Sequence, residues 1–365
     1  MKVKLADVCT CEASNLKQSD VINISGKYPV YGATGKIGYI DTYKQEKPYI
    51  AIVKDGAGIG RTHLCDSKSS VIGTLQYILP KDNVLPEYLF YVIKHMHLEK
   101  YYSGATIPHI YFKNYKNEEF NLDSINKQET IINILNDCNK LINLKEIQLK
   151  KYDDLIKARF VEMFGDVRTS IYNYKTRKLG EVAKVGSSHR VFTTEFVESG
   201  IPFYRGTEIG ELANGQKPSD PYYISEKHYE RLISDDTKPL FGDLLMPSIC
   251  NKGQIWMVDT KKPFYYKDGR VLCISPDRTL FNSKFLQYFM IEKTLMEYPK
   301  MGSGSTFAEF KIFELKNMDI IVPPKEIQDK FSNFVQQVDK SKLAVQKSLE
   351  KTQQLFDSLM QEYFG

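Results

Sequence analysis

Leu155-Ile-Lys-Ala-Arg-Phe-Val-Glu-Met-Phe-Gly165 and Leu355-Phe-Asp-Ser-Leu-Met-Gln-Glu-Tyr-Phe-Gly365 are two copies of one pattern, 200 residues apart. The same offset aligns residues 125–165 with residues 325–365 without a gap, and nine of these 41 positions are identical. Only about two or three identities are expected by chance. The chain is therefore an internal repeat, and the repeat decides how the rest of the sequence is interpreted.

The repeat continues upstream of these segments. Ser103-Gly-Ala-Thr106 matches Ser303-Gly-Ser-Thr306 at the same offset, and an apolar-rich stretch follows each. Lys4-Leu-Ala-Asp-Val8 aligns with Lys178-Leu-Gly-Glu-Val182 at an offset of 174, so the second copy carries about 26 additional residues between these anchors. Each half is thus a globular segment of variable length followed by a segment of fixed length.

The fixed segments are predicted to be helices. Apolar residues recur in both at alternating spacings of four and three, interrupted by Lys145, Lys342 and Thr352. Such a narrow stripe is typical of two helices that pair along their length, although two amphipathic helices lying on their own domains would also produce it. The residues expected in the seam are Ile131, Leu135, Ile142, Leu149, Ile156 and Phe160 in the first helix, and Phe331, Val335, Val338, Val345, Leu349, Phe356 and Met360 in the second.

The globular segments are predicted to be mostly β. Short β-branched and aromatic runs bounded by turn residues predict strands at 49–53, 71–79, 255–258 and 270–275, and one short helix at equivalent places, 87–94 and 284–291. We expect an α+β fold: two mostly-β globular domains, each followed by a long helix, with the helices pairing as an antiparallel coiled coil of pseudo-twofold symmetry. The predicted boundaries are 1–124 and 125–165 for the first half, and 166–324 and 325–365 for the second.

Composition limits the classes of function. No run reaches the ~18 apolar residues of a membrane span, and residues 1–5 lack the features of a signal peptide, so we expect a soluble, cytoplasmic protein with no membrane partner. The net charge of +5 permits a nucleic-acid partner without demonstrating one. The six dispersed cysteines are expected to be free, mostly buried thiols, because a structural zinc site needs four closely spaced ligands.

Two motifs resemble enzyme motifs and are rejected. Gly56-Ala-Gly-Ile-Gly60 follows a predicted strand, as a cofactor loop would, but no helix follows to face a phosphate or carboxylate. Asp220-Pro-Tyr-Tyr223 resembles the Asp-Pro-Pro-Tyr motif of methyltransferases that act on amino groups, but lacks its second proline. The six histidines are dispersed, so we expect no catalytic residues, no metal and no cofactor.

The Ser-Gly-small-Thr stretches are better candidates for binding. Glycine allows the backbone to approach a phosphate, and serine and threonine supply short donors, although each stretch is also consistent with a plain turn. Cationic, amide and aromatic side chains around them are suited to contact DNA. The candidates are Arg61, His63, Lys68, Ser103, Thr106, His109, Tyr111 and Lys113 in the first domain, and His189, Arg190, Arg205, Asn251, Lys252, Lys267, Arg270, Ser303, Ser305 and Thr306 in the second.

Several motifs of the second half resemble those of Type I restriction-modification specificity subunits. They are Lys-Leu-Gly-Glu-Val at 178–182, Gly-Ile-Pro-Phe-Tyr-Arg-Gly at 200–206, Gly-Asp-Leu-Leu at 242–245, Gly-Ser-Gly-Ser-Thr at 302–306 and Ile-Val-Pro-Pro-Lys-Glu-Ile-Gln at 321–328. The resemblance covers the whole chain. The first half departs from it at Asp123-Ser124, which replace the proline pair, and matches the Gly-Ile-Pro-Phe-Tyr-Arg motif only loosely at residues 26–31.

The resemblance implies a non-catalytic subunit with two target recognition domains, one for each half of a double-stranded DNA site. It also implies that the helix pair spaces these domains and docks two modification (methyltransferase) subunits, and that restriction and translocase subunits complete the complex. Two other classes stay open at this point. One is a single-chain methyltransferase or restriction enzyme, and the other is a coiled-coil scaffold that binds no nucleic acid.

Overall fold

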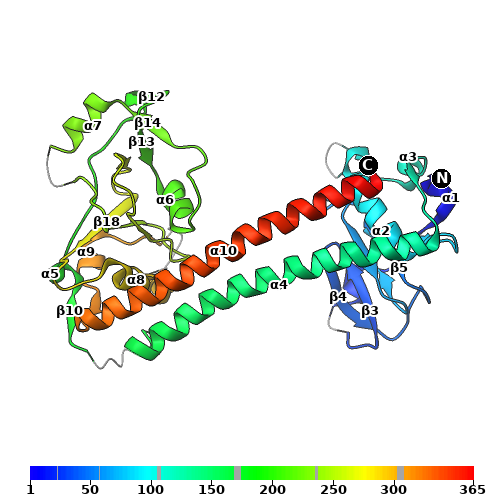
Figure 1. Cartoon of the computed structure of the whole chain (residues 1–365), viewed down its shortest axis with the longest axis horizontal. Helices are drawn as coiled ribbons and strands as arrows, with labels where there is room; N and C mark the ends of the chain where they lie inside the picture. Colours follow the sequence, from blue (N-terminus) through cyan, green and yellow to red (C-terminus); the bar gives the residue numbers. More distant parts are fainter. Residues whose placement is uncertain (23, 57, 105–107, 168–173, 235–236, 302–307) are drawn as a thin grey trace. The chain divides into compact units, whose positions relative to one another are not determined.

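In the computed structural model, the chain folds into two compact units (Figure 1). It describes residues 1–22, 24–56, 58–104, 108–167, 174–234, 237–301 and 308–365. The first unit comprises Met1–Gln148 and Val345–Gly365, and the second comprises Leu149–Ala344. Each unit therefore contains one globular domain, half of the first long helix and half of the second.

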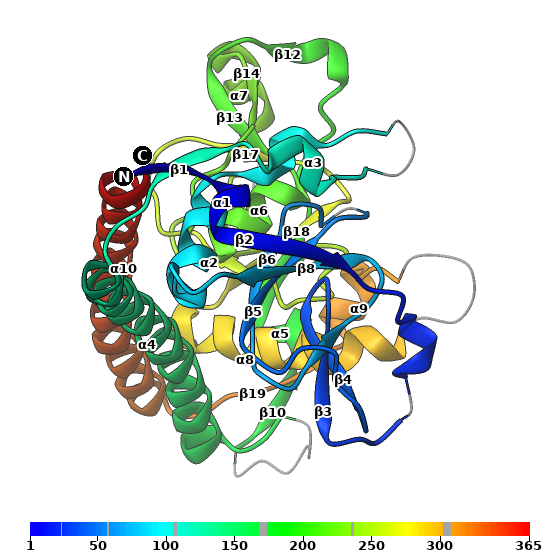
Figure 2. The ribbon, with the colours of Figure 1, turned by 90° about the vertical axis from the view of Figure 1, so that its right-hand side faces the viewer.

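The domain of the first unit is built on a four-stranded antiparallel sheet in the order β2-β8-β5-β6 (Figure 2). A second sheet, β4-β3-β7, contains one parallel pair, and strands β1 and β9 close the domain. The elements are β1 (Lys2–Lys4), α1 (Leu5–Val8), β2 (Cys9–Ala13), η1 (Gln18–Asp20), β3 (Tyr28–Gly32), β4 (Gly35–Ile40), β5 (Tyr49–Val53), β6 (Thr62–Cys65), β7 (Ser70–Val71), β8 (Leu75–Pro80), α2 (Pro86–His95), η2 (Leu98–Tyr101), α3 (Phe112–Tyr115) and β9 (Glu119–Asn121).

The domain of the second unit has a main sheet of the same order, β11-β18-β15-β16. Its second sheet, β12-β14-β13-β17, again contains one parallel pair, β13 with β17. The elements are β10 (Thr176–Lys178), α5 (Leu179–Val182), β11 (Ala183–Gly186), η3 (Thr193–Glu195), β12 (Phe196–Val197), β13 (Ile201–Tyr204), α6 (Gly206–Ala213), β14 (Tyr222–Ile224), α7 (Glu226–Leu232), β15 (Leu244–Pro247), β16 (Trp256–Met257), β17 (Tyr265–Tyr266), β18 (Val271–Pro276), α8 (Ser283–Glu297), η4 (Tyr298–Lys300), α9 (Ile312–Lys316) and β19 (Asp319–Ile321).

The additional residues of the second copy are concentrated in one place. The offset between equivalent elements is 174 at β2 and β11, reaches 195 at β5 and β15, and is 200 at β9 and β19. Most of the insertion therefore lies between the first and second strands of the main sheet, where the second domain carries α6, β14 and α7. The sheet order survives the insertion, which confirms the predicted α+β repeat.

Three of the predicted elements need correction. The run 71–79 is not one strand, because Val71 ends β7 and Leu75 begins β8 in the other sheet. The chain changes sheet where the N–H of Ile72 donates to Tyr31 of β3 and that of Leu75 closes a turn onto Ile72. Helix α8 is also longer than predicted, with 15 residues against 10 in α2. The strand predicted at 255–258 is reduced to Trp256–Met257.

The long helices are α4 (Ile125–Phe164) and α10 (Lys325–Phe364). In the first unit the amino-terminal half of α4 and the carboxyl-terminal half of α10 share a core, and in the second unit the opposite halves do so. The helices therefore pack antiparallel within each unit. Of the seam residues, Leu149, Val345 and Leu349 near the helix centres are half-buried, and the others are buried.

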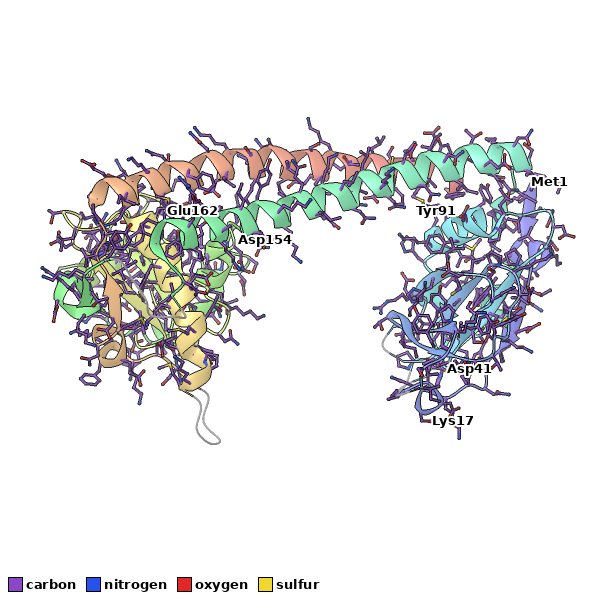
Figure 3. All side chains as sticks on the ribbon, turned by 90° about the horizontal axis from the view of Figure 1, so that it is seen from below. Met1, Lys17, Asp41, Tyr91, Asp154 and Glu162 are labelled. Atoms are coloured by element: carbon purple, nitrogen blue, oxygen red, sulfur yellow. The ribbon has the colours of Figure 1, made fainter. Side chains whose placement is uncertain are left out.

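The buried ends of the helices pack on the domains as well as on each other. In the second unit Phe164 of α4 lies 4.6 Å from the ring of Phe285 in α8, measured between centroids. In the first unit Phe364 of α10 lies 5.4 Å from the ring of Tyr88 in α2. Figure 3 places Tyr91 of α2 on the side of its domain that meets the helices, with Lys17 and Asp41 at the opposite end. Both explanations of the apolar stripe therefore hold at the helix ends, where the helices pack on each other and on the domains.

A buried glutamine at the start of each long helix joins the helix to its domain. The Gln128 side chain accepts the backbone N–H of Leu85 at 2.9 Å and donates to the carbonyls of Asn83 and Asp123. Gln328 accepts the N–H of Asn282 at 2.9 Å and donates to the carbonyls of Leu280 and Pro323. Leu85 and Asn282 are the N-cap residues of α2 and α8, so the two glutamines bind equivalent points of the two domains. We call each buried glutamine and its three hydrogen bonds a clamp.

Within the described residues, no helix combines the length and apolar character needed to cross a membrane.

We predict that Gln328→Met, which keeps side-chain volume but removes all three hydrogen bonds, lowers the free energy of unfolding by about 2–4 kcal/mol, because one N–H and two carbonyls are left buried without partners. Urea denaturation followed by circular dichroism measures the change. The control is Gln346→Met on the exposed face of the same helix, expected to shift stability by less than about 0.5 kcal/mol. Equal effects of the two variants would contradict the clamp.

Candidate nucleic-acid interface

Three backbone segments cross where β5 leaves the main sheet of the first domain. Lys54 donates its N–H to the carbonyl of Thr74 at 2.9 Å, and its own carbonyl accepts the N–H of Ile110 at 2.9 Å. His109 Nδ1 lies 2.6 Å from Asp55 Oδ1, and Lys54 Nζ lies 3.1 Å from Asp55 Oδ2. We name Lys54, Asp55, Thr74 and His109 the first junction. An acid, an imidazole and an ammonium group thus meet at one partly exposed position.

The second domain has the same crossing where β15 leaves its sheet. Ser248 donates its N–H to the carbonyl of Arg270 at 2.9 Å, and its carbonyl accepts the N–H of Phe310 at 2.8 Å. Arg270 Nη1 lies 2.7 Å from Glu309 Oε2, which also accepts from Ser248 Oγ at 3.4 Å. We name Ser248, Arg270 and Glu309 the second junction. The backbone hydrogen bonds of the two junctions agree within 0.1 Å, whereas their side chains differ.

Two further candidates extend the first junction. The rings of His109 and Tyr111 are stacked, with an interplanar angle of 21° and centroids 6.3 Å apart. Lys113 Nζ lies 5.3 Å from the centroid of the Tyr111 ring. The ring of Tyr111 is largely exposed, so these three side chains form a column that is open to solvent at its outer end. An exposed aromatic ring beside a lysine is suited to contact a base or a sugar-phosphate chain.

The remaining cationic candidates of the first domain lie in two places. Arg61 Nη1 and His63 Nε2 both approach the carbonyl of Ala33, at 3.0 and 3.2 Å. Lys68 lies in the turn between β6 and β7 with a positive φ of 53° and pairs with Glu46 at 3.6 Å. The structure therefore brings Arg61 and His63 together and gives Lys68 a different neighbour.

Several candidates of the second domain gather beside its junction. Arg190 Nε lies 3.2 Å from Asp268 Oδ2, and the N–H of His189 donates to the hydroxyl of Tyr265. Lys267 donates its N–H to the carbonyl of Tyr204. Lys267 is part of the loop 267–270 that carries Arg270, and these contacts place His189 and Arg190 next to that loop. Asn251 and Lys252 are exposed in the turn that follows β15.

Arg205 is held within its own domain. Its guanidinium binds both carboxylate oxygens of Glu208, donates to the carbonyl of Asp220 and lies 4.3 Å from the centroid of the Tyr222 ring. Burial alone would raise the pKa of Glu208, but the hydrogen bonds from Arg205 lower it below the usual range. The side chain of Glu208 is 1% exposed, so Arg205 chiefly neutralises a buried acid.

The Ser-Gly-small-Thr stretches are only partly described. Ser103 exchanges two backbone hydrogen bonds of 2.8 Å with His109, so this stretch begins beside the first junction. Thr106, Ser303, Ser305 and Thr306 lie outside the described residues.

The motifs rejected as enzymatic behave as turns or strands. Gly56 and Gly60 have positive φ angles of 93° and 79°, and the chain then enters strand β6 rather than a helix. Tyr222 and Tyr223 belong to β14. The six cysteines are free, and burial raises the pKa of Cys11 to about 11, which disfavours the thiolate that metals bind. Among the described residues no three His, Cys, Asp or Glu side chains are grouped as metal ligands.

Sequence reasoning missed the acidic members of these sites. Asp55, Glu309 and Glu208 are not among the candidates, because the candidates are cationic, amide, hydroxyl and aromatic side chains suited to contact phosphates or bases. One signal was available, since Glu309 aligns with the candidate His109 at the offset of 200. Glu208 also lies three residues after Arg205, a spacing at which helical side chains meet.

Comparisons with known proteins agree with this architecture. The family model for the Type I restriction modification DNA specificity domain matches residues 1–151 and 172–355. The chain is 24% identical over 310 residues to the Type I restriction enzyme MjaIX specificity subunit of Methanocaldococcus jannaschii, an alignment that covers 78% of this chain and 69% of that protein.

Two solved structures share the fold. The S subunit of a Type I restriction-modification system from M. genitalium has a TM-score of 0.57 and 16% identity, and the match covers 100% of this chain and 96% of that one. A chain from a structure describing complex assembly and conformational transition of the type I R-M system has a TM-score of 0.61 and 15% identity, with coverage of 100% and 97%.

We predict that Arg205→Ala destabilises the second domain by about 2 kcal/mol at pH 7, less than for a fully buried pair because Arg205 is partly exposed. The lowered pKa of Glu208 means that the pair stabilises the fold above the pKa of the unfolded carboxyl, and that this stability is lost as the pH falls through the folded pKa. The difference between variant and wild type should therefore shrink as the pH falls below 4.5, the ordinary pKa of a glutamate carboxyl. Thermal denaturation at pH 7 and at about pH 3 measures it.

The control is Arg231→Ala, which removes an exposed pair with Glu195 in the same domain. It should change the transition little at either pH. A loss in Arg205→Ala that does not depend on pH would contradict this role of Glu208.

Proposed function

The chain belongs to the Type I restriction-modification specificity family, and from this we propose that each globular domain reads one half of a bipartite double-stranded DNA site. Specificity subunits recognise DNA for their complex, and other subunits carry out methyl transfer and cleavage. The observation that carries the proposal is that the same main sheet and the same junction occur twice, each time attached to one long helix. Two related readers imply two half-sites.

The symmetry of the repeat gives the proposed site its form. Pseudo-twofold proteins present their two copies to DNA in opposite directions, as dimeric repressors do with their half-sites. The two domains differ in sequence and in the insertion between β11 and β15, so the two half-sites need not share a base sequence. A split, asymmetric site follows from this arrangement.

The chain acts with modification and restriction subunits of its system. We infer that two modification subunits dock on the paired helices, one for each half-site. Adenine methylation requires the base to leave the duplex and enter a catalytic pocket, which the modification subunit would supply together with its cofactor. Since its substrate is DNA, the complex is proposed to work in the cytoplasm.

The alternative functions have less support. A single-chain methyltransferase would use residues 56–60 as a cofactor loop, but that segment leads into strand β6. A scaffold that binds no DNA would have no use for two equivalent junctions of polar side chains. Filter binding to DNA, with and without modification subunits, separates the three functions, and single-molecule mapping of methylated adenines identifies the site.

We predict that the two domains act as modules. Exchanging residues 178–320 for the equivalent segment of a relative should change one half-site and leave the other unchanged, because the first junction and both long helices are retained. Mapping methylated adenines in cells that express the hybrid with its modification subunits measures this. A map in which both half-sites change would contradict the proposal that each domain recognises one half-site.

We also predict that the helices set the distance between half-sites. Inserting one apolar-patterned heptad after Lys145 and another after Val345 keeps the stripe in phase and lengthens the pair by ~10 Å, at ~1.5 Å per residue. DNA rises ~3.4 Å per base pair, so the gap between half-sites should grow by about three base pairs.

The control for this experiment is the same heptad in one helix only. That variant leaves an unpaired turn and should weaken assembly instead of changing the spacing. Methylation at the original spacing by the doubly extended protein would show that the helices do not set the distance.

A further inference from the structure

The two junctions hold different side chains in one backbone frame. Thr74 and Arg270 directly precede equivalent strands of the main sheets, β8 and β18. His109 and Glu309 are equivalent at the offset of 200, and each precedes a residue bonded to the carbonyl of Lys54 or Ser248. The backbone arrangement is thus retained while its polar side chains change. Two domains that recognise different base sequences require such a combination.

The exposed ion pair of the second junction contributes little to folding. The side chains of Arg270 and Glu309 are 62% and 36% exposed. Pairs as exposed as this one stabilise proteins by only about 0–1 kcal/mol. By contrast, the Arg205–Glu208 pair of the same domain contains a buried acid, Glu208. Stability therefore does not account for the Arg270–Glu309 pair, and both of its side chains are accessible to a ligand.

The chemistry of this pair matches one base pair. Arginine binds the O6 and N7 acceptors of guanine through two parallel hydrogen bonds, and a carboxylate accepts from the amino group of cytosine. An arginine and a glutamate 2.7 Å apart present both functions at one place. In the absence of DNA the carboxylate keeps the guanidinium oriented, which reduces the ordering required on binding.

The surroundings of both junctions suit a nucleic-acid backbone. Lys267 lies in the same loop as Arg270, and Arg190 pairs with Asp268 of that loop. The chain that leaves each junction exposes an aromatic ring, Tyr111 in the first domain and Phe313 in the second, where 76% of the residue is exposed. Lys113 and Lys311 accompany these rings on the surface.

From these observations we infer that Arg270 and Glu309 read a guanine-cytosine pair in the half-site of the second domain. Thr74 and His109 occupy the equivalent positions of the first domain, where His109 pairs with Asp55. This inference rests on the proposed function, because it assigns specificity within a DNA site that the two domains are proposed to share. It adds the residues that discriminate between base pairs and the base pair that Arg270 and Glu309 select.

The test compares Arg270→Lys with wild type in the complex with modification subunits. Lysine keeps the positive charge and the attraction to phosphates but loses the planar two-point contact. Binding is measured on the mapped site and on duplexes in which each base pair of both half-sites is changed in turn. We expect discrimination at one guanine-cytosine pair of the second half-site to fall by about tenfold or more, with affinity for DNA lacking the site unchanged.

Arg231→Lys is the matched control, since it alters an exposed arginine that pairs with a glutamate elsewhere in the same domain. It should retain full discrimination at every position. Unchanged discrimination in Arg270→Lys would overturn the inference, as would an equal loss at many positions or in both half-sites, which indicates a general structural effect. If the wild-type complex selects no bipartite site, the proposed function itself fails before the variants are compared.

A transfer of the pair gives an independent test. Thr74→Arg combined with His109→Glu places the second pair in the frame of the first domain. We expect the preferred base pair at one position of the first half-site to change toward guanine-cytosine, with the second half-site unchanged. A variant that folds, shown by an unaltered thermal transition, and retains the wild-type preference in both half-sites would contradict the equivalence of the junctions.

Discussion

A buried amide at the base of each long helix is the constraint on which the architecture depends. Gln128 and Gln328 bond to the cap of a domain helix and to the chain that enters the long helix, so each side chain fixes a helix and a domain to a common point. Both are fully buried, where an unsatisfied amide is costly. Because each amide makes all three bonds, the direction of each long helix is set relative to the domain it leaves.

The junctions show how one frame serves two recognition tasks. Backbone hydrogen bonds hold the crossing segments in both domains, so their side chains are free to change without disturbing the sheet. The insertion of the second domain lies between β11 and β15, in a segment that contributes no residue to the second junction. Divergence between the two copies in this chain is therefore accommodated at polar side chains of the junctions and at one connection, while the two long helices keep the same length.

The sequence was sufficient for features that depend on local pattern. The helices followed from an apolar stripe with only three polar interruptions, and Gln128 and Gln328 are identical residues at equivalent positions of the repeat. The change of sheet after Val71 was not predictable, because it depends on a bond from Ile72 to distant Tyr31. The cationic candidates could be found by type, but the carboxylate that orients Arg270 lies 39 residues away and is supplied by the fold.

The sharing of α10 between the units has a consequence for synthesis on the ribosome. Phe356 and Met360 belong to the core of the unit that begins at Met1, whereas every residue of the other unit precedes Val345. At about 5–20 residues per second, apolar residues such as Ile131 and Leu135 must wait roughly 11–45 seconds for their partners in α10. The domain translated first is thus the last to be completed, and its nascent form presents a hydrophobic surface to chaperones throughout that interval.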